Sequence, residues 1–305
     1  MQVAITGATG VIGRAAVSTL VAAGHEVRAL VRSAAKAEAV TALGATPVHG
    51  SLGDPESLHR LVAGVDAVCN VATAVPVGYA GALPGAWKAN DRLRTQGARA
   101  VVEAARAAGV RRVVQESVSF LYADAGDAWV TESAPLGITR ATEPAAVAET
   151  HVQDYCCGSR AGVVLRLGLV VGDDPATRWQ LRAARRGSPI GLGNPDGWLH
   201  AVHTDDLGPA VLAALSAPSG VYNVGADPVR RAEYVAAFAE ATGRADVGFL
   251  GPVLSRVAGA RAEPLARSLR VSAENFTAAT GWAPRRPVFG PSWLDGVAVA
   301  AGVAP

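Results

Sequence analysis

Three glycines spaced three residues apart follow the first apolar run of the chain and constrain its fold most strongly. The run covers residues 3–5, and Gly7, Gly10 and Gly13 follow it directly. Apolar side chains then recur at helical spacing over residues 17–21. A short buried strand, a glycine-rich turn and a helix are therefore predicted in that order.

Each glycine has a specific use in such a turn. Gly7 permits the tight bend, Gly10 lets the backbone approach a pyrophosphate closely, and Gly13 lets the helix pack on the strand. The unpaired N–H groups and the positive dipole end at the helix start favour phosphate. The turn is therefore interpreted as a dinucleotide site, the alternative being a glycine-rich turn that binds nothing.

Composition excludes several other classes of protein. The chain has 305 residues, half of them hydrophobic, and a formal net charge of only +2. No apolar run approaches the roughly 18–20 uncharged residues of a membrane span, and the first strand follows Met1 too closely for a signal peptide. Scattered arginines give no basic patch, so neither nucleic acid nor a membrane is expected as a partner.

The cysteines indicate a reducing compartment. They are Cys69 and the neighbouring pair Cys156 and Cys157, an odd number that is poor material for a disulfide framework. The pair lacks metal-ligand spacing, and no metal site is expected. A cytoplasmic location is predicted.

Strands alternate with helices along the first two thirds of the chain. After the first strand, further strands are predicted at residues 26–31, 46–49, 65–71, 112–116, 162–169 and, as an added edge strand, 221–224. The intervening helices are predicted at residues 36–43, 55–62, 87–108 and 144–156. This alternation is typical of an α/β fold with a Rossmann-like, doubly wound parallel sheet.

The pattern changes after residue 172. Residues 1–172 are predicted to form a dinucleotide-binding domain that residues 203–225 complete. Residues 173–202 and 226–305 are predicted to form a small C-terminal substrate-binding portion. Its helices are expected at residues 178–186, 233–242, 265–269 and 272–280, with a Gly/Pro loop at 187–197.

With these features the chain resembles the extended short-chain dehydrogenase/reductase family, also called the NAD-dependent epimerase/dehydratase family. Residues 6–13 match its Thr-Gly-x-x-Gly-x-x-Gly signature, and further matching segments lie at residues 54–58, 103–110, 166–172 and 203–206. The resemblance covers essentially the whole chain. It implies a Rossmann fold and a nicotinamide dinucleotide, but function depends on the site rather than the fold.

The residues around the turn favour NADP(H) over NAD(H). An NAD site usually has an acidic residue at the end of the second strand, whereas this chain has Arg32 there and Arg14 just after Gly13. Two guanidinium groups suit a 2′-phosphate. The alternative is that both arginines are ordinary surface residues.

The resemblance extends the cofactor site along the strand ends. Ser51 and Leu52 stand where the family commonly has an aspartate near the adenine. The predicted cofactor-binding residues are Gly7, Thr9, Gly10, Val11, Ile12, Arg14, Arg32, Ser51, Leu52, Ala72, Thr73 and Ser117.

The catalytic pattern of the family is broken. Typical members place a tyrosine four residues before a lysine, whose charge lowers the pKa of the phenol toward working pH. Four residues past the five tyrosines of this chain stand Leu83, Gly126, Ser159, Ala226 and Phe238. The segment where the pair should fall, residues 140–149, contains neither tyrosine nor lysine.

Other groups near the fifth strand are candidate catalytic residues. Tyr122 could donate a proton to a developing alkoxide, and Ser117 and Ser119 could orient a carbonyl. The alternatives are a packed aromatic side chain and two serines that bond within the loop. Two histidines are read as structural, His151 on a helix surface and His203 at a helix entry that Thr204 or Asp205 caps.

Three functions remain open at the level of sequence. The first is an NADPH-dependent reductase of a small or medium apolar carbonyl or enone, working without the Tyr-x-x-x-Lys pair. The second is a non-redox dehydratase, isomerase or cyclase on the same fold. The third is a dinucleotide-sensing binding protein. The long predicted helix at residues 87–108 could also pair two copies in a homodimer.

Overall fold

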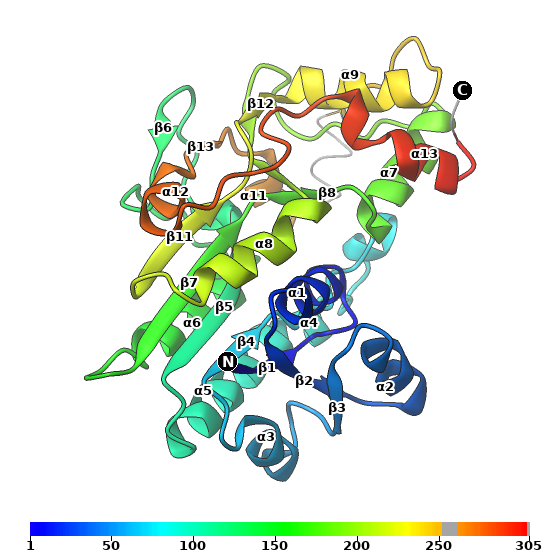
Figure 1. Cartoon of the computed structure of the whole chain (residues 1–305). Helices are drawn as coiled ribbons and strands as arrows, with labels where there is room; N and C mark the ends of the chain where they lie inside the picture. Colours follow the sequence, from blue (N-terminus) through cyan, green and yellow to red (C-terminus); the bar gives the residue numbers. More distant parts are fainter. Residues whose placement is uncertain (252–260, 304–305) are drawn as a thin grey trace.

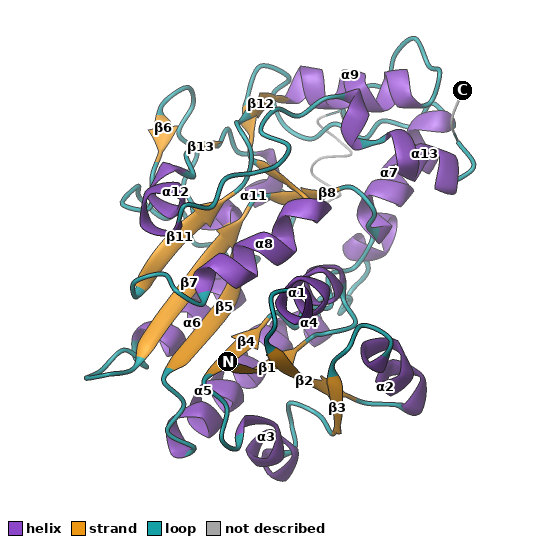
Figure 2. Ribbon diagram, viewed as in Figure 1, coloured by secondary structure: helices purple, strands orange, loops and turns teal. Residues whose placement is uncertain are grey.

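A parallel sheet of seven strands forms the centre of the protein (Figures 1 and 2). The computed structural model describes residues 1–251 and 261–303. The strand order is β11-β7-β5-β4-β1-β2-β3, and all neighbours run parallel. The strands are β1 (Gln2–Thr6), β2 (Glu26–Val31), β3 (Thr46–His49), β4 (Ala67–Asn70), β5 (Arg112–Val118), β7 (Ala161–Leu167) and β11 (Gly220–Val224).

Helices cover both faces of this sheet. One face carries α1 (Val11–Ala22), α2 (Ala34–Thr41) and α8 (Thr204–Ala214), and the other carries α3 (Pro55–Val62), α5 (Ala98–Ala107) and α6 (Glu143–Gln153). Side chains along β1 alternate between the two layers: Val3 and Ile5 join the first core and Ala4 joins the second. The doubly wound Rossmann-like fold predicted from the sequence is confirmed.

The long helix predicted at residues 87–108 contains a wider turn. It consists of α4 (Lys88–Arg92), a π-helical turn η2 (Leu93–Gly97) and α5. Arg94 lies in this π-turn, and its side chain is buried against Glu116 of β5. Such π-turns are frequent at functional sites.

A smaller group of helices lies beyond the carboxyl ends of β5 and β7 (Figure 1). Leu181, Phe238 and Leu294 belong to its apolar core. Its helices are α7 (Pro175–Arg185), α9 (Arg231–Ala241), α11 (Glu263–Ala266) and α13 (Asp295–Ala300), whereas α12 (Glu274–Thr280) packs on β11 of the main sheet through Phe276. Its short strands are β6 (Trp129–Val130), β8 (Leu169–Val171), β9 (Trp198–Leu199), β10 (Ala201–His203), β12 (Val229–Arg230) and β13 (Arg270–Val271).

Two local predictions need correction. The helix expected at residues 265–269 ends at Ala266, because the Leu269 amide donates to the Trp198 carbonyl at 3.0 Å instead of to a helical partner. The cap of α8 is His203 rather than Thr204 or Asp205: the imidazole Nδ1 accepts from the Asp205 amide at 3.1 Å. Tertiary contacts therefore override local propensity at both points.

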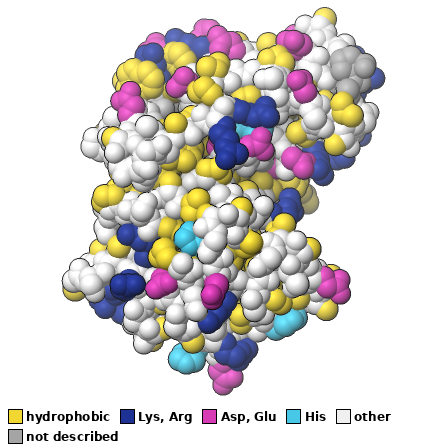
Figure 3. All heavy atoms as spheres, viewed as in Figure 1, with side chains coloured by type: hydrophobic (Ala, Val, Ile, Leu, Met, Phe, Trp, Pro, Cys, Tyr) yellow, Lys and Arg dark blue, Asp and Glu magenta, His cyan; other side chains and the backbone are white. Residues whose placement is uncertain are grey.

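The surface shows no segregation of charge on the face drawn in Figure 3, where basic and acidic side chains are interspersed. Among the described helices, none is long and apolar enough to cross a membrane.

Candidate functional site

The glycine turn between β1 and α1 is dictated by close packing at two positions. Gly7 has φ +74°, and a Cβ added there would lie 2.6 Å from Cα of Ala72. A Cβ on Gly13 would lie 2.1 Å from the Gly7 carbonyl oxygen. Gly10 is exposed, and its nearest such contact is 3.2 Å. The protein itself therefore requires Gly7 and Gly13, while Gly10 leaves backbone open toward solvent.

The start of α1 offers backbone donors beside Gly10. The helix begins at Val11, and among the described residues no side chain caps its first turn. Amides at such a helix start can bind an anionic phosphate, supported by the helix dipole. The turn and the helix start thus form one surface with the chemistry of a pyrophosphate site.

The predicted cofactor residues come from neighbouring strands. Because the strands are parallel, the segments that follow β1, β2, β3 and β4 emerge at one edge of the sheet, where ligands bind in open α/β folds. The fold brings to this edge Gly7, Thr9, Gly10, Val11, Ile12, Arg14, Arg32, Ser51, Leu52, Ala72 and Thr73. Ser117 also lies near this edge, but its side chain is fully buried.

The two arginines of the predicted 2′-phosphate site are both exposed. Arg14 donates to the Thr9 carbonyl at 3.3 Å, across the glycine turn. Arg32 follows β2, and the next residue, Ser33, caps α2 by accepting from the Lys36 amide at 3.4 Å. Both guanidinium groups remain accessible to a ligand.

A chain of buried polar side chains, one hydroxyl and two amides, joins the carboxyl ends of three strands and was not among the predicted site residues. Thr6 of β1 donates to Asn70 of β4 at 2.5 Å, and Asn70 donates to Gln115 of β5 at 2.7 Å. Gln115 in turn donates to the Glu116 carbonyl. The only signal in the sequence is that polar residues end otherwise apolar strands. The network fixes the floor of the site.

Two buried ion pairs stand beside this floor. Arg94 contacts Glu116 at 2.6 Å, and each side chain is only 6% exposed. Burial raises the pKa of Glu116, although Arg94 opposes that shift. The second pair joins Glu149 of α6 to Arg166 of β7 by two bonds of 2.9 and 2.6 Å.

Glu149 also accepts from the Ser117 hydroxyl at 2.5 Å. Burial lowers the pKa of Arg166, but the bonds and charge of Glu149 outweigh this and hold it above its ordinary value. Glu149 of α6 is therefore bonded to both β5 and β7. Glu116 and Arg166 could have been noticed in the sequence, because each is a charged residue inside an otherwise apolar strand.

Tyr122 lies just beyond β5 and is fully buried. Its hydroxyl donates to Asn223 Oδ1 at 2.8 Å, and the Arg166 guanidinium lies 4.8 Å from its ring centroid. Burial raises the pKa of this phenol, and Arg166 and Asn223 offset part of the shift. Its proton is thus engaged within the protein in this state.

Ser119 is likewise buried and bonds His200 Nδ1 at 3.0 Å. His200 is fully enclosed, and burial lowers its pKa to about 3. Its Nε2 has no hydrogen-bond partner among the described residues. The three predicted catalytic residues, Tyr122, Ser117 and Ser119, therefore each bond a different neighbour.

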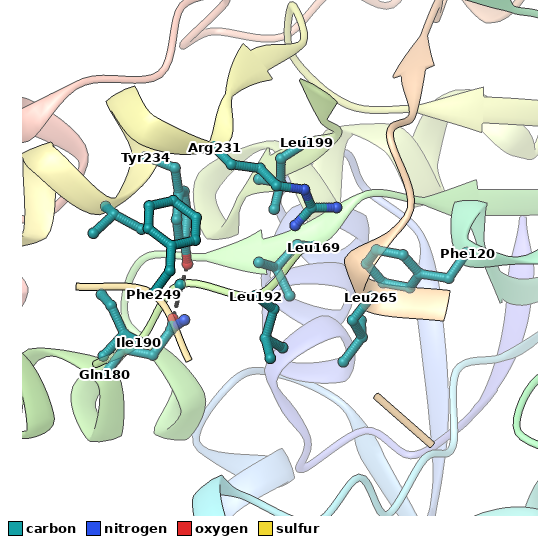
Figure 4. A pocket seen from close by; sticks show the side chains of 12 residues that line it. Phe120, Leu169, Gln180, Ile190, Leu192, Leu199, Arg231, Tyr234, Phe249 and Leu265 are labelled. Carbon is teal, nitrogen blue, oxygen red and sulfur yellow. Dashed lines mark hydrogen bonds between the residues drawn. The ribbon is translucent and has the colours of Figure 1, made fainter. Parts of the chain in front are cut away.

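A small apolar cavity of about 90 Å³ lies between the ends of β5 and β7 and the C-terminal helices (Figure 4). Phe120, next to Ser119, and Leu169, the first residue of β8, line its sheet side. On the opposite side Tyr234 donates to Gln180 at 2.8 Å. Arg231, the first residue of α9, extends its guanidinium into this space (Figure 4).

No group of three His, Cys, Asp or Glu side chains that could hold a metal ion occurs within residues 1–251 and 261–303. The fold and the glycine turn define the class of protein, a Rossmann fold with a phosphate-binding turn of the dinucleotide type.

Comparison with known proteins gives the family. Residues 7–184 match the NAD(P)H-binding family, and the chain belongs to it. Over 97% of its length the chain is 33% identical to a 3-diazoavenalumate denitrifying reductase from a Streptomyces species, covering 99% of that protein. It is 39% identical, over 41% of its length and 35% of the other chain, to a 4-hydroxy-2-methyl-3-oxo-4-farnesyl-3,4-dihydroquinoline-1-oxide ketoreductase from Stigmatella aurantiaca.

Among solved structures, MoeE5 in complex with UDP-glucose and NAD superposes with a TM-score of 0.76, covering 96% of both chains at 23% identity. This likeness shows the same fold, while the family match and the reductase relative confirm the resemblance to the extended short-chain dehydrogenase/reductase family. The protein is an NAD(P)-dependent oxidoreductase or epimerase-like enzyme with reductase relatives.

Proposed function

We propose that this protein is an NADP(H)-dependent reductase whose hydride acceptor leaves no charge on oxygen, so that no tyrosine proton donor is needed. The observation that supports the proposal is that Tyr122, which follows β5, is fully buried with its hydroxyl bonded to Asn223, while no tyrosine of the chain stands four residues before a lysine. Bound NADPH supplies a hydride and leaves as NADP⁺.

An aryl diazonium is an acceptor of this kind. A hydride added to its terminal nitrogen gives a neutral aryl diazene, which loses dinitrogen and leaves the arene. No alkoxide forms, and therefore no proton donor beside the reacting atom is required. The relative that aligns over almost the whole chain is named as a denitrifying reductase of a diazo compound, which supports this choice.

In this reaction the protein's own residues bind the dinucleotide and enclose the substrate. The glycine turn and the start of α1 hold the pyrophosphate, and Arg14 and Arg32 receive the 2′-phosphate of NADP(H). Ser51 and Leu52 lie toward the adenine, and Ala72 and Thr73 along the dinucleotide. Residues 173–202 and 226–305 form the substrate-binding portion, and the cavity beside Phe120 receives part of the substrate.

A second candidate is reduction of a carbonyl or enone, which the ketoreductase relative favours. That reaction leaves charge on oxygen, and Tyr122 would supply the proton while Ser117 and Ser119 orient the carbonyl. It requires Tyr122 to release Asn223 during turnover, because the two are bonded in this structure.

The experiment compares acceptors directly. Purified protein and NADPH are mixed with 4-carboxybenzenediazonium, with 4-carboxyacetophenone and with 4-carboxybenzylideneacetone, and nicotinamide oxidation is followed beside enzyme-free controls. We expect one NADPH consumed for each diazonium lost, with release of dinitrogen. Faster turnover of the ketone or the enone supports the second candidate instead. Diazonium loss without NADPH oxidation contradicts the first candidate, and no NADPH oxidation with any of the three acceptors contradicts both.

A further inference from the structure

The side chain of Arg231 is a buried cation inside an apolar cavity. It is 4% exposed, and the cavity around it is lined mainly by Phe120, Leu169, Leu199 and other apolar residues. Arg231 Nη2 donates to the Arg267 carbonyl, while Nε has no hydrogen-bond partner among the described residues. The guanidinium therefore keeps donor capacity that the fold does not use.

No carboxylate of the described chain forms an ion pair with Arg231. The neighbouring arginine, Arg267, has its own partner in Glu263 at 2.8 Å. Asp124 acts on Arg231 only through its charge, since its oxygens accept from the amides of Gly126 and Ser268 at 3.0 Å. Residues 252–260 contain no Asp or Glu in their sequence.

This arrangement is costly unless a ligand completes it. Burial lowers the pKa of Arg231 to about 10, so the side chain is still charged at neutral pH. An unpaired charge in an apolar environment is strongly unfavourable, and buried charges in proteins are normally paired. A planar guanidinium binds a carboxylate through two parallel bonds.

We propose that Arg231 binds the carboxylate of the substrate, so that the enzyme acts on a small apolar carboxylic acid. The orientation of the substrate toward the hydride rests on the proposed function, whereas the binding of a carboxylate by Arg231 does not. The cavity of about 90 Å³ admits a carboxylate and the carbons next to it. An engineered cavity that binds benzene measures about 150 Å³, so the cavity beside Arg231 takes one end of the substrate.

The position of the cavity sets the direction of the substrate. Phe120 follows β5 and Leu169 follows β7, so the cavity lies beside the carboxyl ends of these strands, where ligands bind in open α/β folds. When Arg231 at the start of α9 binds the carboxylate, the opposite end of the acid lies toward the hydride donor. Arg231 thereby selects acids over neutral analogues.

The test measures binding without turnover. Cinnamate and its neutral amide, cinnamamide, are titrated by calorimetry into the full-length protein saturated with NADP⁺. For the wild type we expect cinnamate to bind at least about 30-fold more tightly than cinnamamide. In Arg231→Gln the two affinities should agree within about threefold, and Arg231→Lys should fall between the two proteins.

The matched control is Arg182→Gln, which removes an exposed arginine from α7 and should keep the wild-type preference. Equal affinity of the wild type for both probes, or an unchanged preference in Arg231→Gln, overturns the proposal. If Arg231→Gln does not fold, the wild-type comparison and Arg231→Lys decide. Retained cinnamate selectivity in a protein that oxidises no NADPH would contradict the proposed function while leaving the anion site intact.

Thermal unfolding gives a second readout that separates binding from structure. A ligand-binding cation is retained at a cost to stability, so Arg231→Met should melt at the wild-type temperature or above it without ligand. Cinnamate should raise the melting temperature of the wild type and leave that of Arg231→Met unchanged. A lower melting temperature of Arg231→Met, together with an equal cinnamate shift in both proteins, indicates a purely structural arginine.

Discussion

Glu149 on α6 and Arg166 on β7 are joined by two hydrogen bonds of 2.9 and 2.6 Å, and both side chains are almost completely buried. Ser117 adds a third bond to the same carboxylate. The pair ties a helix to the two strands whose carboxyl ends border the site.

Removing one partner of this pair should destabilise the fold strongly. Glu149→Gln leaves the Arg166 charge buried without compensation, and we expect a loss of about 3–5 kcal/mol in the free energy of unfolding, measured by urea denaturation. The control is Glu103→Gln, which breaks the exposed Arg99–Glu103 pair on α5 and should leave stability unchanged. Equal effects of the two substitutions would refute the role assigned to burial.

The cofactor preference depends on the two arginines near the turn. Arg32→Ala should weaken NADPH binding about 10- to 100-fold and leave NADH binding nearly unchanged, because only NADPH carries the 2′-phosphate. Arg14→Ala should act in the same direction. Fluorescence titration with both nucleotides measures this, with Arg99→Ala on the exposed side of α5 as control. If Arg32→Ala weakened NADPH and NADH binding equally, Arg32 would not be part of a 2′-phosphate site.

Tyr122→Phe discriminates the two candidate reactions. If the acceptor needs no proton, the rate of NADPH oxidation should stay within about threefold of the wild type. Stability should fall by about 1–2 kcal/mol, since Asn223 loses a buried partner. A collapse of the rate with unchanged NADPH affinity would instead identify Tyr122 as the proton donor of a carbonyl reductase.

His200 should make the fold sensitive to acid. Its pKa is lowered to about 3 in the folded state from an ordinary value near 6.5, so the unfolded chain takes up the proton first. The stability due to this group is fully present above pH 6.5 and is lost as the pH falls toward 3. Between pH 7 and pH 5 the loss should be about 2 kcal/mol.

Urea denaturation at the two pH values measures this dependence. His200→Gln should flatten it, whereas His49→Gln on an exposed strand end should not. An equal pH dependence of the wild type and His200→Gln would show that His200 is not the group responsible.

The sequence was sufficient for the fold and for the phosphate turn because both depend on local signals. Apolar runs, helix caps and the spacing of Gly7, Gly10 and Gly13 act within a few residues of each other. The ion pairs could not be predicted in the same way. Glu116 and Arg94 are 22 residues apart and meet only because of a π-turn, and Glu149 meets Arg166 only once α6 lies on the sheet.

The role proposed for Arg231 in binding the substrate could not be predicted from the sequence either. In the sequence it is one of two adjacent arginines at a helix start, and either could be a solvated surface residue. Packing separates them: Arg230 lies 3.8 Å from the Trp198 ring centroid and bonds Asp127, while Arg231 turns into the cavity. Burial of one and pairing of the other depend on chain segments far away in sequence.

The pH dependence of single-turnover hydride transfer tests the central claim most directly. Protein loaded with NADPH is mixed rapidly with 4-carboxybenzenediazonium between about pH 6 and pH 8 in H₂O and in D₂O. We expect a rate that is independent of pH, with a solvent isotope effect near unity and a primary isotope effect from NADPH deuterated at the transferred position. A rate that follows an ionising group and slows in D₂O would contradict this expectation, because a protein proton would then be moving in the transition state.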